Sequence, residues 1–247
     1  MDDDLTATDF VEQTAGPTRA AGGNRGTPSG RVSRTLAQEP ECDEGPVQAL
    51  SWEPRVFLFK SMLSAAECAR VIELGERLGL EQSRLTATGD KTASGPAAAG
   101  KFLSPELDPL LQEIDRRVAD WAMIPPEHAE SGYLLRYEEE QQYQPHFDYF
   151  EGEAAQRHAN SGGQRVVTVV LYLSKPQGGG ETVFPLVPLT VQPDIGDALL
   201  IHNTLPNGNL DPKTLHGSNP LSRGPKYTYT KWIRERPYPH SWYLRDA

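Results

Sequence analysis

The segment 165–173 reads RVVTVVLYL, a continuous run of apolar and β-branched residues. β-branched side chains favour extended backbone, and an unbroken apolar run is typical of a strand that is covered on both of its faces. A strand of this kind lies in the interior of a protein. We therefore expect the chain to build its core around a β-sheet that contains this segment.

Further short segments of β-type sequence lie on either side of this run. Gly, Pro and Asn turns separate them, and no internal repeat is apparent. Many short strands with such turns predict a double-sheet barrel or sandwich. The predicted strands are 55–59, 133–137, the segment around His146, 165–173, 181–184, 187–192, 197–202, 214–218 and 227–233, with a mobile loop at 151–164.

Two helices are predicted ahead of most of these strands. Ser64 and Glu67 have the spacing of a capping box at the start of the first helix, and Gly79 suits its C-terminal left-handed position. The second helix is predicted to have Ser104 as its N-cap and Pro105 as its first residue. Each helix carries an apolar stripe, so we expect both to pack on one sheet. The stripes are Cys68, Val71, Ile72 and Leu78 in the first helix, and Leu107, Leu110, Leu111, Ile114, Val118 and Trp121 in the second.

The N-terminal segment differs in composition from the rest of the chain. Residues 1–46 are rich in Gly, Pro, Ser, Thr, Ala and acidic residues, without sustained hydrophobic periodicity. Such a segment cannot bury enough apolar surface to offset its ordering entropy. We predict a disordered tail at 1–46 and one domain at 47–247. The polar segment 84–100 is predicted to be a long loop, either a functional lid or a plain surface loop, and Trp242 and Tyr243 are expected to pack back on the barrel.

Composition and charge exclude several functional classes. A net charge of -10 and a pI near 5.1 argue against a broad nucleic-acid-binding face. Two cysteines cannot build a disulfide framework or a cysteine-rich zinc site. The N-terminus lacks the basic and apolar regions of a signal peptide, and no apolar run is long enough for a membrane span. We therefore expect a soluble protein with no nucleic-acid or membrane partner, in the cytoplasm as written or in the secretory-pathway lumen if a leader has been removed. The oligomeric state is left open.

The segment 137–150, YEEEQQYQPHFDYF, holds the candidate chemistry. His146 and Asp148 form a His-x-Asp pair, and on a strand the side-chain period of two puts both on one face, about 6 to 7 Å apart along the backbone. One metal ion could be held between them. With a distant second histidine, they would make the facial triad of non-haem Fe(II) oxygenases, which leaves three coordination positions open.

The chain offers several histidines as the distal ligand. His216 is the best candidate because it precedes a turn that leads to Lys226 at the start of an alternating strand. His202, at the end of a buried strand, is the competing candidate. The other histidines lie in predicted loops and are interpreted as solvated: His128, His158 and His240.

Lys226 would point into the same barrel as His216 if its strand returns beside the site. A buried ammonium group needs an anionic partner, because an unpaired buried charge is costly. A dicarboxylic co-substrate that chelates the metal with one end and reaches Lys226 with the other would be such a partner. The hydroxyl groups of Thr168 and Tyr137 could add hydrogen bonds to the far carboxylate.

These residues resemble those of the 2-oxoglutarate- and Fe(II)-dependent dioxygenases, and the surrounding sequence is similar to the catalytic domain of prolyl 4-hydroxylases. The similar segments occur in the family's order and cover roughly residues 50 to 235. They are Leu63-Ser64-x2-Glu67-Cys68, Tyr137-x5-Tyr143-x2-His146-x-Asp148-Tyr149-Phe150, Gly162-Gly163-Gln164-Arg165-x2-Thr168, Tyr172-Leu173, Gly179-Gly180-Glu181-Thr182-x-Phe184-Pro185, Pro193-x2-Gly196-Asp197-Ala198, Leu215-His216-Gly217 and Lys231-Trp232.

The resemblance implies a mainly β fold with flanking helices. This fold would be a double-stranded β-helix of the jelly-roll type, with the two N-terminal helices packed on the major sheet. The resemblance also implies Fe(II) as the metal, with His146, Asp148 and His216 as its ligands. In the family's reaction, 2-oxoglutarate and O₂ give succinate and CO₂ while a prolyl C4 is hydroxylated, and L-ascorbate rescues iron that has become oxidised.

The same resemblance assigns roles around the metal. Lys226 would bind the far carboxylate of 2-oxoglutarate, with Tyr137 and Thr168 nearby. Three further residues match positions near the peptide groove or the pocket wall: Arg165, Trp232 and Tyr143. The alternative reading of Arg165 and Trp232 is a surface cation and a core aromatic.

Departures from the family pattern lie on the substrate side. Pro96-Ala97-Ala98-Ala99 stands where the family often has an Arg-x-Ser element, so a peptide-contacting arginine is missing, and Glu140 stands where a glycine is usual. We expect a prolyl 4-hydroxylase whose partner is a Pro-containing peptide or protein. The alternatives are a dioxygenase of the same fold that acts on another peptidyl residue or on free proline, and a non-catalytic barrel that binds Pro-rich peptides.

Overall fold

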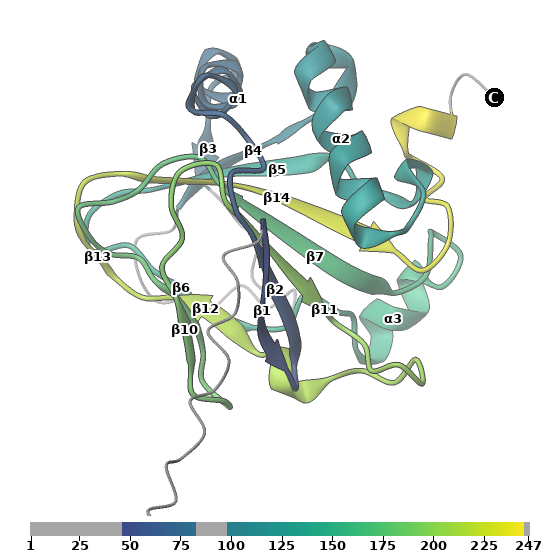
Figure 1. Ribbon diagram of the computed structural model, residues 1–247. Helices are drawn as coiled ribbons and strands as arrows, with labels where there is room; N and C mark the ends of the chain where they lie inside the picture. Colours follow the sequence, from purple (N-terminus) through teal and green to yellow (C-terminus); the bar gives the residue numbers. More distant parts are fainter. Residues whose placement is uncertain (1–45, 83–97, 245–247) are drawn as a thin grey trace, which may run out of the picture. The chain divides into compact units, whose positions relative to one another are not determined.

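The computed structural model of the chain describes residues 46–82 and 98–244 (Figure 1). The predicted disordered tail, apart from Pro46, and the predicted lid or loop, apart from residues 98–100, lie outside these ranges. Within them, no helix is both long enough and apolar enough to cross a membrane.

In the described part of the chain, eight antiparallel strands form a major sheet in the order β1-β2-β11-β7-β14-β5-β4-β3. The apolar run forms β7 (Arg165–Tyr172), between β11 (Ala198–His202) and β14 (Lys226–Arg234). Val167 and Leu171 on one face of β7 and Tyr172 on the other are at most 2% exposed, so the prediction of a strand covered on both faces is confirmed. The other strands of this sheet are β1 (Val47–Trp52), β2 (Arg55–Phe59), β3 (Glu81–Gln82), β4 (Ala99–Leu103) and β5 (Gly132–Tyr137).

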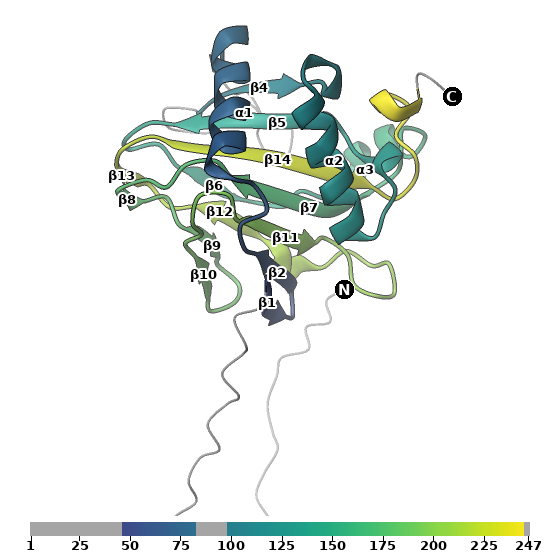
Figure 2. The same cartoon turned by 45° about the horizontal axis from the view of Figure 1, so that its top comes forward.

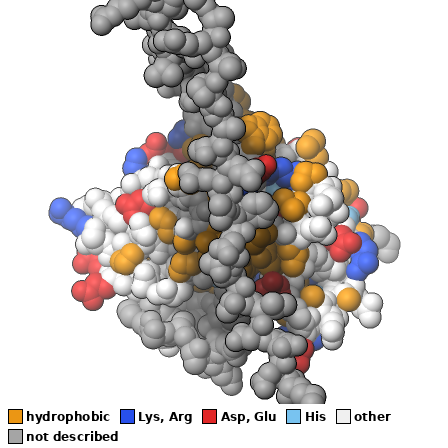
Figure 3. Space-filling view, turned by 90° about the horizontal axis from the view of Figure 1, so that it is seen from below, with side chains coloured by type: hydrophobic (Ala, Val, Ile, Leu, Met, Phe, Trp, Pro, Cys, Tyr) orange, Lys and Arg blue, Asp and Glu red, His pale blue; other side chains and the backbone are white. Residues whose placement is uncertain are grey.

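A smaller sheet lies on the side of the major sheet away from the helices (Figure 2). Its strands, in spatial order, are β10 (Leu189–Val191), β9 (Thr182–Phe184), β12 (His216–Ser218) and β6 (Tyr143–His146), and β8 (Gly178–Gly179) pairs separately with β13 (Leu221–Arg223). Figure 3 shows this side of the molecule, where apolar side chains gather in the middle and charged ones lie mostly towards the rim. The mainly β, two-sheet prediction is confirmed, while β1, β3, β4, β8 and β13 are additional strands.

Two helices, α1 (Ala65–Leu78) and α2 (Pro109–Ala122), cover the other face of the major sheet, as predicted (Figures 1 and 2). Ser64 and Glu67 make the predicted capping box: the Glu67 backbone N–H donates to Ser64 Oγ at 3.2 Å, and the Ser64 N–H donates to the Glu67 carboxylate at 2.7 Å. The main core lies between these helices and the sheet. It includes Val71, Leu74, Leu111, Ile114, Val118, Leu134, Val167 and Leu171.

The second helix begins later than predicted. Ser104 and Pro105 start a 3-10 turn, η1 (Pro105–Leu107), and Asp108 caps α2 by accepting a hydrogen bond from the backbone N–H two residues later, at 2.9 Å. The Asp108-Pro109 pair carries the same start signal as Ser104-Pro105. The sequence therefore contains two signals, and the second one starts the α-helix.

Two details of the other predictions are wrong. Leu78 and Leu107 are each 43% exposed, because one lies in the last turn of α1 and the other in η1, beyond the core-facing stripes. The segment predicted as a mobile loop contains the helix α3 (Gly152–His158). Three more 3-10 turns are η2 (Pro126–His128), η3 (Pro212–Thr214) and η4 (Trp242–Leu244).

A buried ion pair connects α2 to the middle of the major sheet. Lys231 Nζ on β14 lies 2.7 Å from Asp115 Oδ1 on α2 and donates to the Glu130 carbonyl at 2.6 Å. Because alternate residues of a strand point to opposite faces, β14 directs Lys231 to the helices and Lys226 to the smaller sheet. At the C-terminal end, the Tyr243 hydroxyl donates to the Gln112 carbonyl at 3.2 Å, so this tyrosine packs back on the domain, against α2.

Candidate active site

His146, Asp148 and His216 come together in the space between the two sheets. His216 on β12 pairs directly with His146 at the end of β6, and Asp148 lies in a bend just after β6. Potential ligand atoms of the three residues all lie within 4.8 Å of one another. The His146 Nε2 atom is 3.4 Å from Asp148 Oδ1, and the His216 Nε2 atom is 3.6 Å from Asp148 Oδ2. Two ligand atoms at right angles on one ion, each about 2.1 Å from it, are roughly 3 Å apart, so this spacing fits a single metal ion.

Both histidine rings are oriented by a local backbone contact. The His146 Nδ1 atom lies 3.0 Å from the Gln144 carbonyl, and the His216 Nδ1 atom lies 2.9 Å from the Thr214 carbonyl. A carbonyl can only accept, so Nδ1 of each ring carries the proton. Each Nε2 lone pair then faces Asp148, and a metal-binding histidine is usually held in this way, with its other ring nitrogen donating to a backbone carbonyl.

The charges of the cluster also suit a metal. Burial alone would raise the pKa of Asp148, but its neighbours His146, His216 and Arg165 outweigh that effect and hold the pKa well below its usual range. Burial lowers the pKa of His216, against the opposing effect of Asp148. An ionised carboxylate and a neutral imidazole are the forms that bind metal ions.

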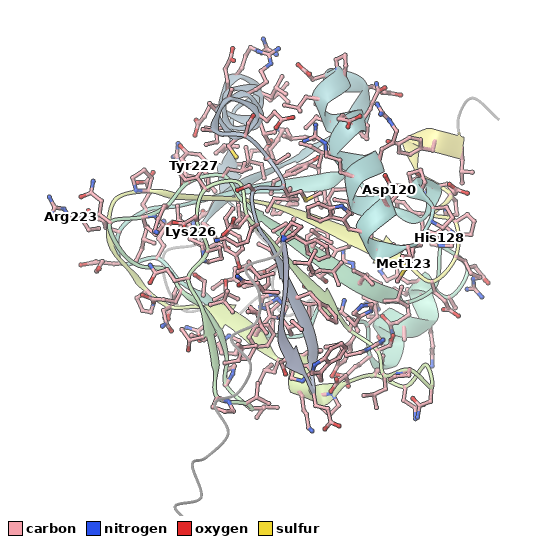
Figure 4. The ribbon with its side chains drawn as sticks, viewed as in Figure 1. Asp120, Met123, His128, Arg223, Lys226 and Tyr227 are labelled. Carbon is pink, nitrogen blue, oxygen red and sulfur yellow. The ribbon has the colours of Figure 1, made fainter. Side chains whose placement is uncertain are left out.

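A pocket adjoins the cluster, and Lys226 is one of its lining residues, with 3% of its surface exposed. Figure 4 shows where Lys226 lies in the domain. Its Nζ donates to the Gly180 carbonyl at 2.6 Å and to Ser218 Oγ at 2.9 Å, both of which are neutral. Within the described residues, no carboxylate forms an ion pair with it. Burial lowers the pKa of Lys226 to about 8, although the charge of Glu181 acts in the opposite direction. A buried cation with only neutral partners is a site for an anion.

Several hydroxyl groups share this pocket with Lys226. Lys226 Nζ lies 5.4 Å from the centre of the Tyr137 ring, and burial raises the pKa of Tyr137 well above its ordinary value, so its phenol stays protonated. The remaining lining residues are Tyr133, Leu135, Tyr143, His146, Asp148, Val170, Thr182, His216, Gly217, Ser218, Thr228, Thr230 and Trp232.

Thr168 occupies a different position from the one expected of a co-substrate ligand. It does not line the pocket, and its hydroxyl donates to Asp148 Oδ2 at 2.7 Å. Three other threonines line the pocket, namely Thr182, Thr228 and Thr230. The Thr182 Oγ1 atom is 2.7 Å from the Tyr172 hydroxyl. Thr182 belongs to the Gly-Gly-Glu-Thr segment, which is one of the segments that resemble the family. That resemblance could have pointed to Thr182 as a pocket residue.

Of the three residues expected near the peptide, Trp232 and Tyr143 line the pocket and Arg165 does not. The Arg165 guanidinium lies over the Trp232 ring at 4.0 Å and makes a two-point ion pair with Glu130, at 2.7 and 2.9 Å. It is therefore neither a free surface cation nor a direct part of the pocket wall. The Tyr143 ring meets His146 edge-on, with 4.2 Å between the ring centres.

The competing histidine, His202, is not part of the cluster. Its ring meets Phe57 edge-on at 6.0 Å, and burial lowers its pKa to about 4. Two of the histidines interpreted as solvated have partners instead: His128 Nδ1 is 3.0 Å from the Arg234 carbonyl, and His158 stacks on Phe150 at 4.1 Å. His240 is exposed.

Glu140, which replaces a usual glycine, has a positive φ of 67°. This left-handed conformation is free of strain for glycine and costs other residues about 1 kcal/mol. Its N–H donates to the Leu221 carbonyl at 2.8 Å. The turn that glycine would make is thus kept, with an exposed acidic side chain added.

Comparisons with known proteins identify sequence relatives of this chain. The family model described as the 2OG-Fe(II) oxygenase superfamily matches residues 132–234. Among curated proteins, the chain is 38% identical over 232 residues to probable prolyl 4-hydroxylase 10 of Arabidopsis thaliana, covering 84% of this chain and 79% of that protein. It is 36% identical over 227 residues to probable prolyl 4-hydroxylase 7 of the same plant, covering 83% and 70%.

Solved structures give the same picture of the fold. The viral collagen prolyl hydroxylase of Paramecium bursaria Chlorella virus-1, in complex with 2OG, has a TM-score of 0.57 and 22% identity, covering 78% of this chain and 98% of that one. A Pseudomonas putida prolyl-4-hydroxylase has a TM-score of 0.50 and 20% identity, covering 73% and 92%. This likeness confirms the predicted double-stranded β-helix of the jelly-roll type.

Proposed function

Because the chain belongs to the prolyl 4-hydroxylase family and is a 2-oxoglutarate- and Fe(II)-dependent dioxygenase, we propose that it converts prolyl residues of a peptide or protein to 4-hydroxyproline. Bound iron and 2-oxoglutarate supply the oxidising chemistry: one atom of O₂ enters the substrate C–H bond, the other enters succinate, and CO₂ is released. L-Ascorbate would act as the reductant that restores oxidised iron. The protein itself contributes open coordination positions, orientation and a pocket that excludes water.

In this proposal, His146, Asp148 and His216 bind Fe(II), and Lys226 binds the far carboxylate of 2-oxoglutarate. The observation that carries the proposal is Lys226, a buried cation whose hydrogen-bond partners are neutral and which shares a pocket with the three ligands. A dicarboxylate that chelates the metal and reaches Lys226 neutralises this charge. Tyr137 and Thr182, which line the same pocket, would donate hydrogen bonds to the dicarboxylate.

The substrate side of the pocket has an aromatic wall. Trp232 and Tyr143 are proposed to contact the peptide, with Arg165 keeping the Trp232 ring in place by stacking on it. Among the described residues, the buried indole N–H of Trp232 has no hydrogen-bond partner, so this wall holds one unsatisfied donor. An aromatic face with one donor suits a proline-containing segment, whose ring is apolar and whose carbonyls stay unpaired in an extended conformation.

The proposal is tested in two stages. Anaerobic addition of Fe(II) and 2-oxoglutarate should give the weak visible charge-transfer band of the chelate. The loaded enzyme is then supplied with O₂ and with poly(L-proline), a collagen-like peptide or a Ser-Pro-rich peptide, and we expect mass spectrometry to find one added oxygen on proline. Free proline and matched peptides with alanine in place of proline are the controls. Oxygen added to another residue or to free proline would contradict the proposed substrate, and a chelate band without O₂-dependent succinate on any substrate would contradict catalysis.

The affinity for 2-oxoglutarate should depend on pH through Lys226. Its pKa of about 8 means that the ammonium is charged below pH 8 and neutral above it. The dissociation constant, measured from the chelate band, should therefore be flat below pH 8 and rise towards tenfold per pH unit above it. In Lys226→Arg the side chain stays charged, and the rise should disappear. A wild-type constant that stays flat between pH 7 and pH 9 would contradict this assignment.

A further inference from the structure

We propose that Thr168 and Asn203 are positioning residues that hold Asp148 so that only one of its carboxylate oxygens is offered to the metal. This inference rests on the proposed function and extends it to a question of coordination. The three side chains form a continuous buried chain of hydrogen bonds. Thr168 Oγ1 donates to Asp148 Oδ2 at 2.7 Å, and Asn203 Nδ2 donates to Thr168 Oγ1 at 2.9 Å.

Chemistry fixes which group donates in each of these hydrogen bonds. A threonine hydroxyl has one proton to give, and an ionised carboxylate can only accept. Asn203 uses an N–H to reach the Thr168 oxygen, so the hydroxyl proton has Asp148 as its acceptor. All three side chains are at most 6% exposed, so water does not compete for these bonds.

The fold keeps both positioning residues in place. Thr168 lies on the central strand β7 and pairs in register with Ile201 on β11. Asn203 follows β11 directly, and its backbone is held on both sides: its N–H donates to the Val166 carbonyl at 2.9 Å, and its carbonyl accepts from the Asp211 N–H at 3.0 Å. The hydrogen bonds to Asp148 therefore originate from rigid strands of the major sheet, while Asp148 itself lies in a bend outside any strand.

The consequence concerns the number of open positions on the metal. Three protein ligand atoms leave three of six positions free, and a chelating 2-oxo acid takes two of them. If Asp148 bound through both oxygens, the position left for O₂ would be lost. Both carboxylate oxygens lie near a histidine of the cluster, Oδ1 at 3.4 Å from His146 Nε2 and Oδ2 at 3.6 Å from His216 Nε2. Only Oδ2 accepts the hydrogen bond from Thr168, so in this proposal Oδ1 is the oxygen that binds the metal. Thr168 and Asn203 thus reserve the last position without touching the metal or the substrate.

Thr168→Val tests this inference because valine keeps the shape of threonine and removes the hydroxyl. We expect two changes. The affinity of the metal-free protein for Mn(II), measured by EPR, should fall about 10- to 100-fold, as is usual when a hydrogen-bond partner of a metal ligand is removed. Nitric oxide, an O₂ surrogate, should also bind more weakly to the anaerobic Fe(II)·2-oxoglutarate complex, which is read from the EPR signal of the nitrosyl. Thr168→Ser, which keeps the hydroxyl, should stay close to wild type in both measurements.

A double-mutant cycle separates the pair from a general packing effect. Asn203→Leu should weaken Mn(II) and nitric oxide binding in the wild-type background and have no further effect in Thr168→Val, because Asn203 acts through the hydroxyl. Thr190→Val, the same change at an exposed position of β10, is the matched control. Thermal unfolding is recorded for every variant. If Thr168→Val does not fold, Asn203→Leu alone carries the test, since it leaves Asp148 and Thr168 intact.

The outcomes distinguish this inference from the function on which it rests. Wild-type protein that binds neither Mn(II) nor 2-oxoglutarate would overturn the proposed function itself. Wild-type protein that binds both, together with a folded Thr168→Val that binds Mn(II) and nitric oxide equally well, would overturn only the positioning role. Equal losses in Thr168→Val and Thr168→Ser would also overturn it, because packing and not the hydroxyl would then be responsible.

Discussion

Alanine at His216 should abolish O₂-dependent succinate formation, whereas alanine at His202 should leave it in place. His216 Nε2 faces Asp148 across the proposed metal position, so its loss removes one of three ligands. Removing a group that hydrogen-bonds to a metal ligand already lowers metal affinity or activity 10- to 100-fold, and loss of the ligand itself should exceed the upper end of that range. His202 lies outside the cluster and contacts Phe57 instead. Succinate release and Mn(II) affinity are measured side by side for both variants.

The two substitutions control for each other, since both remove an imidazole that is at least partly buried. Equal thermal stability of His216→Ala and His202→Ala would exclude unfolding as the cause of any difference. Metal affinity provides a second readout that does not depend on turnover. An inactive His202→Ala beside an active His216→Ala would show that the wrong histidine had been assigned as the ligand.

Replacing Lys226 by alanine should raise the dissociation constant of 2-oxoglutarate by roughly 30-fold or more. Truncating one partner of a buried, hydrogen-bonded charge pair costs about 2 kcal/mol or more, and each 1.4 kcal/mol is tenfold in affinity. The constant is read from the anaerobic chelate band, so chemistry does not enter the measurement. Metal binding without co-substrate should change little, because the Lys226 ammonium bonds to Gly180 and Ser218 and not to the three ligands.

A change of ligand sharpens this test. 2-Oxopentanoate keeps the chelating end of 2-oxoglutarate and lacks the far carboxylate, so wild-type protein should bind it much more weakly. Lys226→Ala should bind the two acids almost equally. Lys175→Ala, which removes an exposed lysine, should keep the wild-type preference. An unchanged preference in Lys226→Ala would exclude Lys226 as the anchor.

The sequence was sufficient to predict the fold class and the residues that form the candidate site. The β-branched run at β7 and the capping box at Ser64 are local signals, and local signals survive in the folded chain. His146 and Asp148 are close in sequence, so their proximity required only an extended backbone. His216 was harder, because its place opposite His146 depends on strand pairing between β6 and β12. His216 could still be assigned because Leu-His-Gly is one of the segments that resemble the family, and the resemblance implies that its histidine is a metal ligand.

The sequence did not distinguish the roles of Thr168 and Thr182. Thr168 lies on β7 of the major sheet and Thr182 on β9 of the smaller sheet, and which of them lines the pocket depends on where each strand crosses the barrel. Asn203 was not predicted to be near the site, for a related reason. It follows a strand and looks like a turn residue, and its amide meets Thr168 only because β11 and β7 are neighbours in the sheet. Contacts of this kind arise from tertiary structure and leave no periodicity in the sequence.

The start of the second helix could not be predicted for a different reason, because the sequence contains two N-cap and proline signals for it. Ser104-Pro105 and Asp108-Pro109 are both helix starts by composition, and only the second has the register that buries Leu111 and Ile114. Packing of the apolar stripe therefore selected between two equivalent local signals.

The location of the pocket has a consequence for the amount of enzyme in a cell. The histidines of the cluster belong to β6 and β12 of the smaller sheet, whereas Lys226 belongs to β14 of the major sheet. In the proposed binding mode, a metal with bound 2-oxoglutarate would span this interface and bind only the native state. At a hundredfold excess over its dissociation constant, a ligand of this kind adds about 2.7 kcal/mol to the free energy of unfolding. Depletion of iron or of 2-oxoglutarate would then increase the unfolded fraction that proteases remove. The supply of the two small molecules would set the lifetime of the protein as well as its rate.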